Sequence, residues 1–321
     1  MTKSCVLIGL GQIGINYDYD RVDGSLIFTH ARAIDKHPEF KLVGAVDISK
    51  EQRARFKKQY KLPTFNDPEF AVQKLQPDLV VIATPTESHC SILTKVINAC
   101  RPKLVLCEKP LAYELKEANK MVEMCKKAGV DLFVNYMRRV DQGVLEIKRW
   151  IDNGKIKTPV KANVWYSKGI YNSGSHFINL LSLWLGNIIS TKIINPNHLS
   201  KNHDPEPDFE VQFNLGTAVF RAAWEDAFSH YSIELLSRSG RLLYDKGGEL
   251  IKWQGTTVDP RISGYRILDK QKEIINNSMD IYQWHVYDYI HKHLKGEVTT
   301  LCTGLEAIET LESINLLIKD G

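Results

Sequence analysis

The sequence lacks the features that mark membrane proteins and secreted proteins. Its richest apolar stretch, Ile178 to Leu185, ends at Gly186 and is far shorter than the ~20 residues that span a bilayer. The apolar run from Val6 to Leu10 is too short for a signal sequence. Both observations predict a cytoplasmic protein with no membrane partner.

Cysteine is present but never in a metal-binding arrangement. The six cysteines include no C-x-x-C pair, and five of them lie within the first 125 residues. This spacing argues against a zinc site and against a framework of secreted disulfides. We therefore expect buried, reduced thiols and no bound metal.

An excess of one charge is also missing. The 42 Lys and Arg residues against 38 Asp and Glu residues leave a net charge of +4 on 321 residues. This weak charge does not require a nucleic-acid partner, although it is compatible with a ligand that carries phosphate. The 43% hydrophobic content is ordinary for a globular protein, and the length suits two domains.

The first part of the chain alternates short β runs with helical patterns, and this rhythm predicts parallel βαβ units in a doubly wound sheet. Ser49-x-x-Gln52 is a capping box, Asp67-Pro68 is a helix start, and Gly129 ends a helix. The expected strands are residues 5–8, 41–46, 79–83, 103–107 and 130–134. We assign residues 1–137 to this α/β domain.

The pattern changes after Tyr136, where β runs joined by short turns predict a mainly antiparallel sheet. We assign residues 138–321 to a second domain that binds substrate and forms oligomers. The expected strands are residues 160–166, 192–195, 209–215, 218–224, 231–236 and 241–244. The expected helices are residues 142–153, 176–185, 281–294 and 304–318.

The clearest binding motif is the glycine turn that follows the first strand. In Gly9-x-Gly11-x-x-Gly14, the first glycine permits the tight bend, the second admits a pyrophosphate, and the third lets helix and strand pack closely. The helix that follows would offer N–H donors to phosphate. A glycine-rich turn without a ligand is the alternative, but its place in the first βαβ unit favours a dinucleotide. Gln12 and Ile13 complete the predicted contact set.

Asp47 ends the second strand, where an acid accepts hydrogen bonds from the adenosine ribose. An acid there repels a 2′-phosphate and favours NAD, whereas nearby Lys50 and Arg53 leave NADP open. Asp47 lies 33 residues after Gly14, beyond the usual spacing of about 20. The excess is an insertion, residues 16–29, which is either a solvated loop or part of the cofactor mouth.

Glu108-Lys109-Pro110 follows the fifth strand directly. The carboxyl ends of parallel strands are where doubly wound folds bind ligands. Lys109 would donate to or deprotonate a substrate hydroxyl if burial and the nicotinamide charge lower its pKa. Pro110 restricts the lysine, and a cis bond before Pro110 would aim it. The alternative is an ordinary solvated lysine.

His176 opens the first helix of the second half, after Asn172-Ser-Gly-Ser. A helix N-terminus disfavours the imidazolium, so His176 would be a neutral acceptor suited to a proton shuttle. The alternative is a histidine bonded to local backbone. His89 follows the Thr84-Pro85 turn, from which it would approach the nicotinamide. The other histidines, His30 included, have no comparable setting.

Several of these motifs together resemble the Gfo/Idh/MocA oxidoreductases, the family of glucose–fructose oxidoreductase and inositol dehydrogenase. The motifs are Gly9-Leu-Gly11-Gln-Ile-Gly14, Ala83-Thr84-Pro85, Glu108-Lys109-Pro110-Leu111-Ala112, Asn135-Tyr136-x-Arg138 and Gly174-Ser175-His176. The resemblance implies a Rossmann domain, a second domain with a large open sheet, and assembly as a homodimer or homotetramer. It implies hydride transfer between nicotinamide and a carbinol carbon of a sugar or cyclitol.

The resemblance also implies roles for individual residues. Lys109 and His176 match the family's catalytic lysine and histidine. Five residues would border the cofactor: Thr84, Pro85, His89, Glu108 and Lys109. Asn172 and Asn179 stand where the family often has aspartate, and because Asn cannot take a proton, proton transfer falls to Lys109 or His176.

The Asn172 version resembles members that act on nucleotide-linked sugars in polysaccharide pathways, so we expect such a substrate. The expected substrate contacts are Tyr136, Arg138, Tyr166, Lys168 and Asn172, with Arg139 also near a diphosphate. Alternatives are a free sugar or cyclitol substrate, an NAD-dependent glycosidase, and a non-catalytic dinucleotide sensor.

Overall fold

The computed structural model describes residues 2–21, 24–196 and 204–319, and it divides into two compact units. The first unit is Met1–Val140 with Asp280–Glu309, and the second is Asp141–Met279 with Thr310–Gly321. The predicted domains, 1–137 and 138–321, were each one continuous segment. They differ from these units because the chain returns to the first unit late in the sequence.

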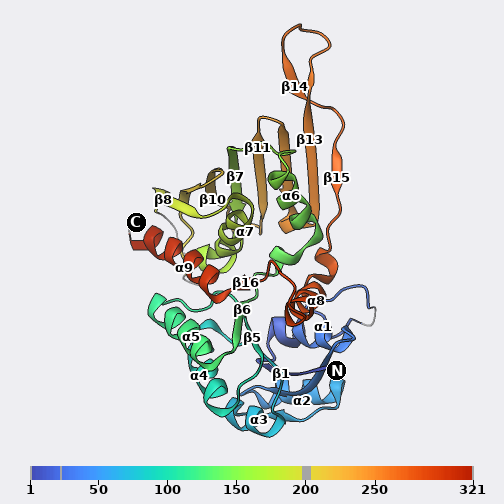
Figure 1. Ribbon diagram of the computed structural model, residues 1–321, viewed down its shortest axis with the longest axis vertical. Helices are drawn as coiled ribbons and strands as arrows, with labels where there is room; N and C mark the ends of the chain where they lie inside the picture. Colours follow the sequence, from blue (N-terminus) through green and yellow to red (C-terminus); the bar gives the residue numbers. More distant parts are fainter. Residues whose placement is uncertain (1, 22–23, 197–203, 320–321) are drawn as a thin grey trace. The chain divides into compact units, whose positions relative to one another are not determined.

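The first unit contains a seven-stranded sheet of order β16-β6-β5-β4-β1-β2-β3 (Figure 1). All neighbouring strands are parallel except β16, which pairs antiparallel with β6. The strands are β1 (Lys3–Ile8), β2 (Phe40–Val46), β3 (Thr64–Phe65), β4 (Leu79–Ile82), β5 (Leu104–Cys107), β6 (Asp131–Val134) and β16 (Cys302–Thr303). The predicted doubly wound parallel sheet is therefore confirmed.

Three helix ends of the first unit lie where the local sequence predicts them. Ser49 accepts a hydrogen bond from the Gln52 N–H, Asp67 caps the next helix before Pro68, and Gly129 ends a helix with a left-handed φ of 67°. The helices are α1 (His30–Lys36), α2 (Lys50–Tyr60), α3 (Pro68–Leu75), α4 (His89–Ala99), α5 (Leu115–Ala128) and α8 (Tyr282–Leu294).

Helix α8 belongs to the first unit because its apolar side chains complete that unit's core. Val286, Tyr287 and Ile290 are buried with Cys5 and Leu7 of β1. Burying these large side chains against the sheet contributes roughly 1.5–3 kcal/mol each. This packing returns residues 280–309 to the first unit.

The second unit contains a nine-stranded sheet of order β14-β13-β12-β11-β7-β10-β9-β8, with β15 paired to β13. It is antiparallel except for the β7–β10 pair. The strands are β7 (Val160–Tyr166), β8 (Ile188–Asn195), β9 (Asp208–Phe213), β10 (Gly216–Ala222), β11 (Ser232–Ser237), β12 (Gly240–Asp245), β13 (Leu250–Val258), β14 (Arg266–Leu268) and β15 (Glu273–Ile275). The mainly antiparallel sheet is confirmed; β13, β14 and β15 were not predicted.

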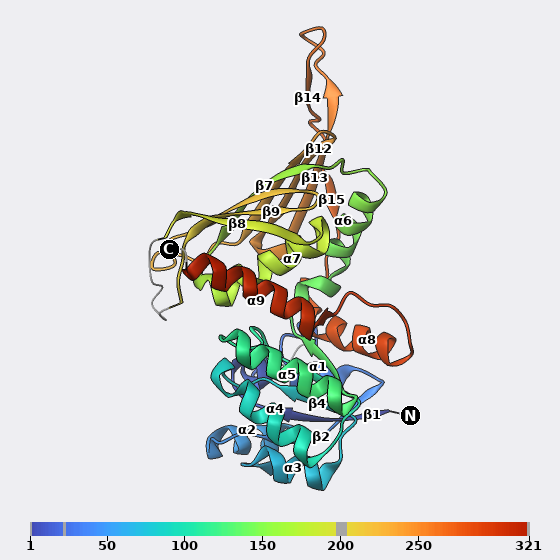
Figure 2. The same cartoon turned by 60° about the vertical axis from the view of Figure 1, so that its left-hand side comes forward.

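One face of this sheet is covered by helices and the other is open (Figure 2). Burial alternates strictly along β7, so Val160, Ala162, Val164 and Tyr166 face the core. They pack with α6 (Gln142–Asp152), α7 (Ser175–Leu185) and the end of α9 (Gly304–Lys319). The intervening β7 residues lie on the open face.

Candidate dinucleotide site and catalytic residues

The predicted cofactor residues lie at the carboxyl ends of neighbouring parallel strands. The glycine turn follows β1, Thr84-Pro85 follows β4, and Glu108-Lys109 follows β5, with β4 between the other two strands. Because parallel strands end at one edge of a sheet, these three turns share that edge. Strand order reverses direction next to β1, and such a switch point is where open α/β sheets bind ligands.

The three glycines of the turn have different steric surroundings. Gly9 has φ 101°, and a Cβ there would lie 2.4 Å from the Ala83 carbonyl oxygen. A Cβ on Gly14 would lie 2.3 Å from the Gly9 carbonyl oxygen, whereas one on Gly11 would meet nothing within 4 Å. Gly9 and Gly14 are therefore required by the fold, and Gly11 leaves open space where a pyrophosphate would approach.

The helix expected after the glycine turn is interrupted. Gln12–Asn16 form only a short π-helical turn, and α1 does not begin until His30. The N–H groups of Ile15 and Asn16 both donate to the Gly11 carbonyl. The first N–H groups of the turn precede this ladder, so the turn still presents donors, but on one helical turn rather than a full helix.

Asp47 lies beside the glycine turn in spite of its distance along the sequence. Its Oδ2 accepts the Leu10 N–H at 2.7 Å and its Oδ1 accepts the Ser49 N–H at 2.7 Å. Arg53 donates to the carbonyls of Asp47 and Ile48 at 2.7 and 2.9 Å. The acid is thus held at the glycine turn, and Arg53 Nη1 is directed at backbone carbonyls.

The insertion is a folded loop over its described residues, which omit 22 and 23. Asp18 is 2% exposed and accepts hydrogen bonds from the Phe28 and Thr29 N–H groups and the Thr29 hydroxyl. Phe28 stacks on Tyr282 with ring centroids 5.4 Å apart. Burial raises the pKa of Tyr282, and the charge of Glu108 raises it further. The loop is therefore anchored close to Glu108 rather than free in solvent.

The prediction that His89 touches the nicotinamide is wrong in this structure. His89 is fully buried, with Nε2 2.9 Å from the Thr84 carbonyl oxygen and Nδ1 3.2 Å from that of Leu111. Ser88 donates to the Thr84 hydroxyl at 2.8 Å. His89 therefore contacts the Thr84-Pro85 turn from the interior of the protein, whereas Pro85 is exposed to solvent.

Glu108 and Lys109 are both half-buried, and the Lys109-Pro110 peptide is cis. Glu108 Oε1 accepts from His30 Nε2 at 2.8 Å and from Asn135 Nδ2 at 2.6 Å. Burial by itself raises the pKa of the Glu108 carboxyl, but the hydrogen bonds from His30 and Asn135 prevail and lower it. An ionised carboxylate therefore adjoins the predicted catalytic lysine.

Behind Glu108 lies a buried polar cluster that sequence reasoning missed. His30 Nδ1 is 2.9 Å from the Tyr287 hydroxyl and 2.8 Å from Gln283 Nε2, and Gln283 accepts from Asn135 at 3.2 Å. His30, Tyr287 and Gln283 are each 0% exposed. The one available signal was that His30 and Tyr287 are polar residues on apolar helix faces.

In the second unit, a π-helical turn, Gly169–Gly174, leads directly into α7. Asp204 accepts the N–H of Asn172 at 2.9 Å, and Glu206 accepts that of Gly169 at 3.0 Å. Asn172 is half-buried and Lys168 is exposed in a left-handed conformation, φ 68°. Carboxylates therefore hold the main chain that carries these two predicted substrate residues.

His176 is buried in the first turn of α7, at 9% exposure. The free helix N-terminus expected there is absent among the described residues, because Gly174 is itself helical and the Ser175 N–H donates to carbonyls of the preceding turn. His176 therefore does not lie at a free helix N-terminus, contrary to the prediction from the sequence. Its predicted catalytic role rests on the family motif alone.

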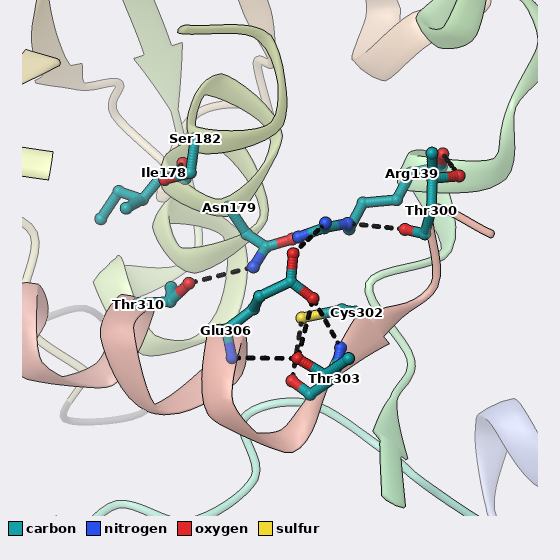
Figure 3. Close-up of polar contacts among 9 residues, drawn as sticks. All are labelled: Arg139, Ile178, Asn179, Ser182, Thr300, Cys302, Thr303, Glu306 and Thr310. Atoms are coloured by element: carbon teal, nitrogen blue, oxygen red, sulfur yellow. Dashed lines mark hydrogen bonds and ion pairs between the residues drawn. The ribbon is translucent and has the colours of Figure 1, made fainter. Parts of the chain in front are cut away.

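Two of the expected diphosphate contacts are used elsewhere in the fold. Tyr166 is fully buried and donates to the Pro207 carbonyl at 2.6 Å. Arg139 is 5% exposed, donates to the Thr300 carbonyl at 2.8 Å and pairs with Glu306 (Figure 3). Tyr166 is therefore excluded as a substrate contact, and Arg139 as a diphosphate contact.

Three other predicted site residues, Tyr136, Arg138 and Asn179, differ in their exposure to solvent. Tyr136 is 5% exposed at the end of β6, and Arg138 is half-buried two residues later, with Nη1 3.7 Å from Met137 Sδ. Asn179 is buried and donates to Thr310 at 3.0 Å (Figure 3). Only Arg138 of these three keeps partial access to solvent.

All six cysteines are buried, as expected. Burial raises the pKa of the Cys107 thiol, next to Glu108, well above its ordinary value. Within residues 2–21, 24–196 and 204–319, no group of His, Cys, Asp and Glu side chains could hold a metal ion, and no helix has the length and apolarity to cross a membrane. The glycine turn, Asp47 and Glu108 fit a dinucleotide instead.

Comparison with known proteins agrees with this geometry. Residues 3–136 match the sequence profile of the Gfo/Idh/MocA group, described as an oxidoreductase family with an NAD-binding Rossmann fold. The chain is 30% identical over 158 residues to a scyllo-inositol 2-dehydrogenase (NAD(+)) of Bacillus subtilis, a match that spans 49% of this chain and 42% of the relative. The similarity to that relative thus covers less than half of its length.

Two further comparisons extend over nearly the whole chain. An inositol 2-dehydrogenase 2 of Saccharopolyspora erythraea is 28% identical over 317 residues, 93% of this chain and 87% of the relative. The crystal structure of the WlbA dehydrogenase from Bordetella pertussis, with NADH and UDP-GlcNAcA, has a TM-score of 0.77 at 19% identity and covers 100% of this chain and 96% of that one. Residues 3–136 are therefore similar to the Gfo/Idh/MocA oxidoreductases and match their NAD-binding Rossmann fold, over somewhat less than half of the chain.

Proposed function

We propose that the protein transfers a hydride between NAD and a secondary alcohol carbon of a sugar or cyclitol. The observation that carries this proposal is the Glu108-Lys109 turn at the carboxyl end of β5, on the sheet edge that also carries the glycine turn. A binding module has no need of a lysine beside a half-buried, hydrogen-bonded carboxylate at this edge. The inositol dehydrogenases among its relatives support the same class of reaction.

The proposed step balances in atoms and electrons. NAD supplies the hydride acceptor, the carbinol C–H and O–H bonds break, and a ketone forms. Lys109 takes the hydroxyl proton directly or in concert with His176, and Asn172 orients the hydroxyl without taking a proton. The reverse direction returns the same proton.

We predict further that the substrate sugar is linked to a nucleotide. Of the cations predicted to contact a diphosphate, Lys168 is exposed and Arg138 is half-buried. Asp204 and Glu206, which hold the neighbouring turn, oppose an anion at Asn172. We therefore expect a neutral ring at Asn172, with any diphosphate placed on the Lys168 side.

The test is formation of NADH, followed by its absorbance, when the protein and NAD are mixed with inositols, free aldoses and UDP-, GDP- and CMP-sugars. Net NADH with one of them is the expected result. Release of a sugar without net NADH would identify a glycosidase that recycles its hydride. Tight NADH binding with no turnover on any compound would identify a sensor.

Cofactor choice is tested at Asp47. In Asp47→Asn the amide keeps an acceptor for the Leu10 N–H but loses the charge that repels a 2′-phosphate. We expect the NADH dissociation constant to rise about 10-fold, which is ~1.4 kcal/mol of binding free energy. NADPH should bind more tightly than it does to the parent protein. Fluorescence titration of both cofactors measures the change. An unchanged NADH-to-NADPH ratio would remove Asp47 from the site.

A further inference from the structure

We propose that the buried His30 is a positioning residue for the cofactor: its Nε2–H holds the Glu108 carboxylate so that only Oε2 is presented to NAD. The inference rests on the proposed function, because it takes NAD as the ligand at this edge. His30 begins α1 directly after the insertion, and Glu108 directly follows β5, 78 residues away.

The hydrogen bonds around His30 determine which nitrogen carries the proton. Asn135 Nδ2 donates to Gln283 Oε1 at 3.2 Å, which turns the Gln283 amide nitrogen toward His30 Nδ1 at 2.8 Å. An amide nitrogen only donates, so Nδ1 accepts and Nε2 carries the proton. Nε2 therefore donates to Glu108 Oε1 at 2.8 Å.

The two carboxylate oxygens of Glu108 consequently have different hydrogen-bond partners. Oε1 receives the His30 and Asn135 donors at 2.8 and 2.6 Å, whereas the Lys109 N–H reaches Oε2 at a long 3.4 Å. Oε2 keeps capacity to accept from a ligand hydroxyl or amide. A carboxylate with one oxygen held by two donors cannot rotate without losing both hydrogen bonds, so Oε2 is aimed by His30 and Asn135.

The cluster joins four separate segments of the first unit. His30 comes from α1, Glu108 from the end of β5, Asn135 from the end of β6, and Gln283 and Tyr287 from α8. All but Glu108 are buried, and the Glu108 side chain is 12% exposed. A buried polar cluster costs stability unless its members are hydrogen-bonded, so its position beside the cofactor edge points to a positional role.

Two substitutions at His30 separate the two ring nitrogens. The amide nitrogen of glutamine lies near the place of Nε2, so His30→Gln keeps a donor to Glu108. The amide of asparagine lies near Nδ1, so His30→Asn loses that donor while still meeting Gln283 and Tyr287. Tyr287→Phe is the matched control, because it removes only the hydroxyl that contacts Nδ1.

The experiment is NADH titration of the full chain by fluorescence across a range of pH, with thermal melts in parallel. We expect His30→Asn to weaken NADH binding about 10-fold, since hydrogen bonds to charged groups are the strong ones. His30→Gln and Tyr287→Phe should stay within about threefold of the parent protein. The His30 hydrogen bond lowers the pKa of Glu108, so without it the loss of NADH binding on acidification should begin at a higher pH.

Other outcomes distinguish this inference from the proposed function. If the unaltered protein does not bind NADH, the proposed function fails and the inference with it. If it binds NADH but His30→Asn binds equally well with the same pH dependence, only the inference is overturned. Equal losses in His30→Asn and His30→Gln, with parallel drops in melting temperature, would show a purely structural role and overturn it as well.

If the His30→Asn variant fails to fold, Glu108→Gln tests the proposal instead. That variant keeps the shape of the side chain and an oxygen to accept from His30, but it has no carboxylate to titrate. NADH binding should then depend less on pH in the acidic range than it does in the parent protein. A pH dependence like that of the parent protein would show that Glu108 is not the group that His30 holds, and would overturn the proposal.

Discussion

Lys109→Met lowers the turnover number by about 10²–10⁴-fold, the usual contribution of a positioned proton-transfer group. Methionine keeps the length and apolar stem of lysine but has no amine to take the hydroxyl proton. NADH binding should change far less, because the glycine turn and Asp47 hold the other end of the cofactor. Initial rates at saturating substrate, with the compound found in the NADH screen, measure the effect.

Two controls sharpen this prediction. Lys109→Arg keeps the positive charge but cannot release a proton, so it should restore little activity. Lys103→Met alters a lysine at the opposite end of β5, where Lys103 pairs with Asp78 at 2.9 Å and is half exposed, so turnover should be unaffected. Full turnover in Lys109→Met would remove the lysine from the mechanism.

Gly11→Ala should abolish most NADH binding while leaving the protein as stable as before. Gly11 has φ −74° and ψ −153°, a conformation that alanine adopts, and its Cβ would meet nothing within 4 Å. The new methyl group occupies the space that a pyrophosphate needs. We expect a rise in the NADH dissociation constant of about 10-fold or more, ~1.4 kcal/mol. Fluorescence titration and a thermal melt measure the two effects.

Gly14→Ala is the matched comparison within the same turn. Its Cβ would lie 2.3 Å from the Gly9 carbonyl oxygen, so the strand and the turn must move apart. This overpacking should cost about 1–3 kcal/mol of stability. A melting temperature lowered equally in Gly11→Ala would contradict the open space above Gly11.

Some errors of the sequence reading had a local signal that was available. Tyr166 has the same parity in β7 as Val160, Ala162 and Val164, so strict alternation places it in the core rather than at a substrate. Ile251 and Trp253 alternate with polar residues in β13 in the same way. In both strands the period-2 pattern of the sequence marks the residues that face the core.

Other parts of the site had no local signal. His30, Glu108, Asn135 and Gln283 meet only because α1, β5, β6 and α8 pack in one unit, although they span more than 250 residues. His176 shows the same limit: the residues before it favour a helix start, but the π-helical turn from Gly169 continues into α7.

The sequence by itself determined the doubly wound fold, the glycine turn and the place of Lys109, because these depend on period, capping and glycine sterics over a few neighbouring residues. The tertiary structure decided that Asp47 reaches the Leu10 N–H in spite of the insertion. It also decided that residues 280–309 return to the first unit and that His30 lies behind Glu108. Those contacts join segments far apart in the chain, and only the packing of apolar faces determines which segments become neighbours.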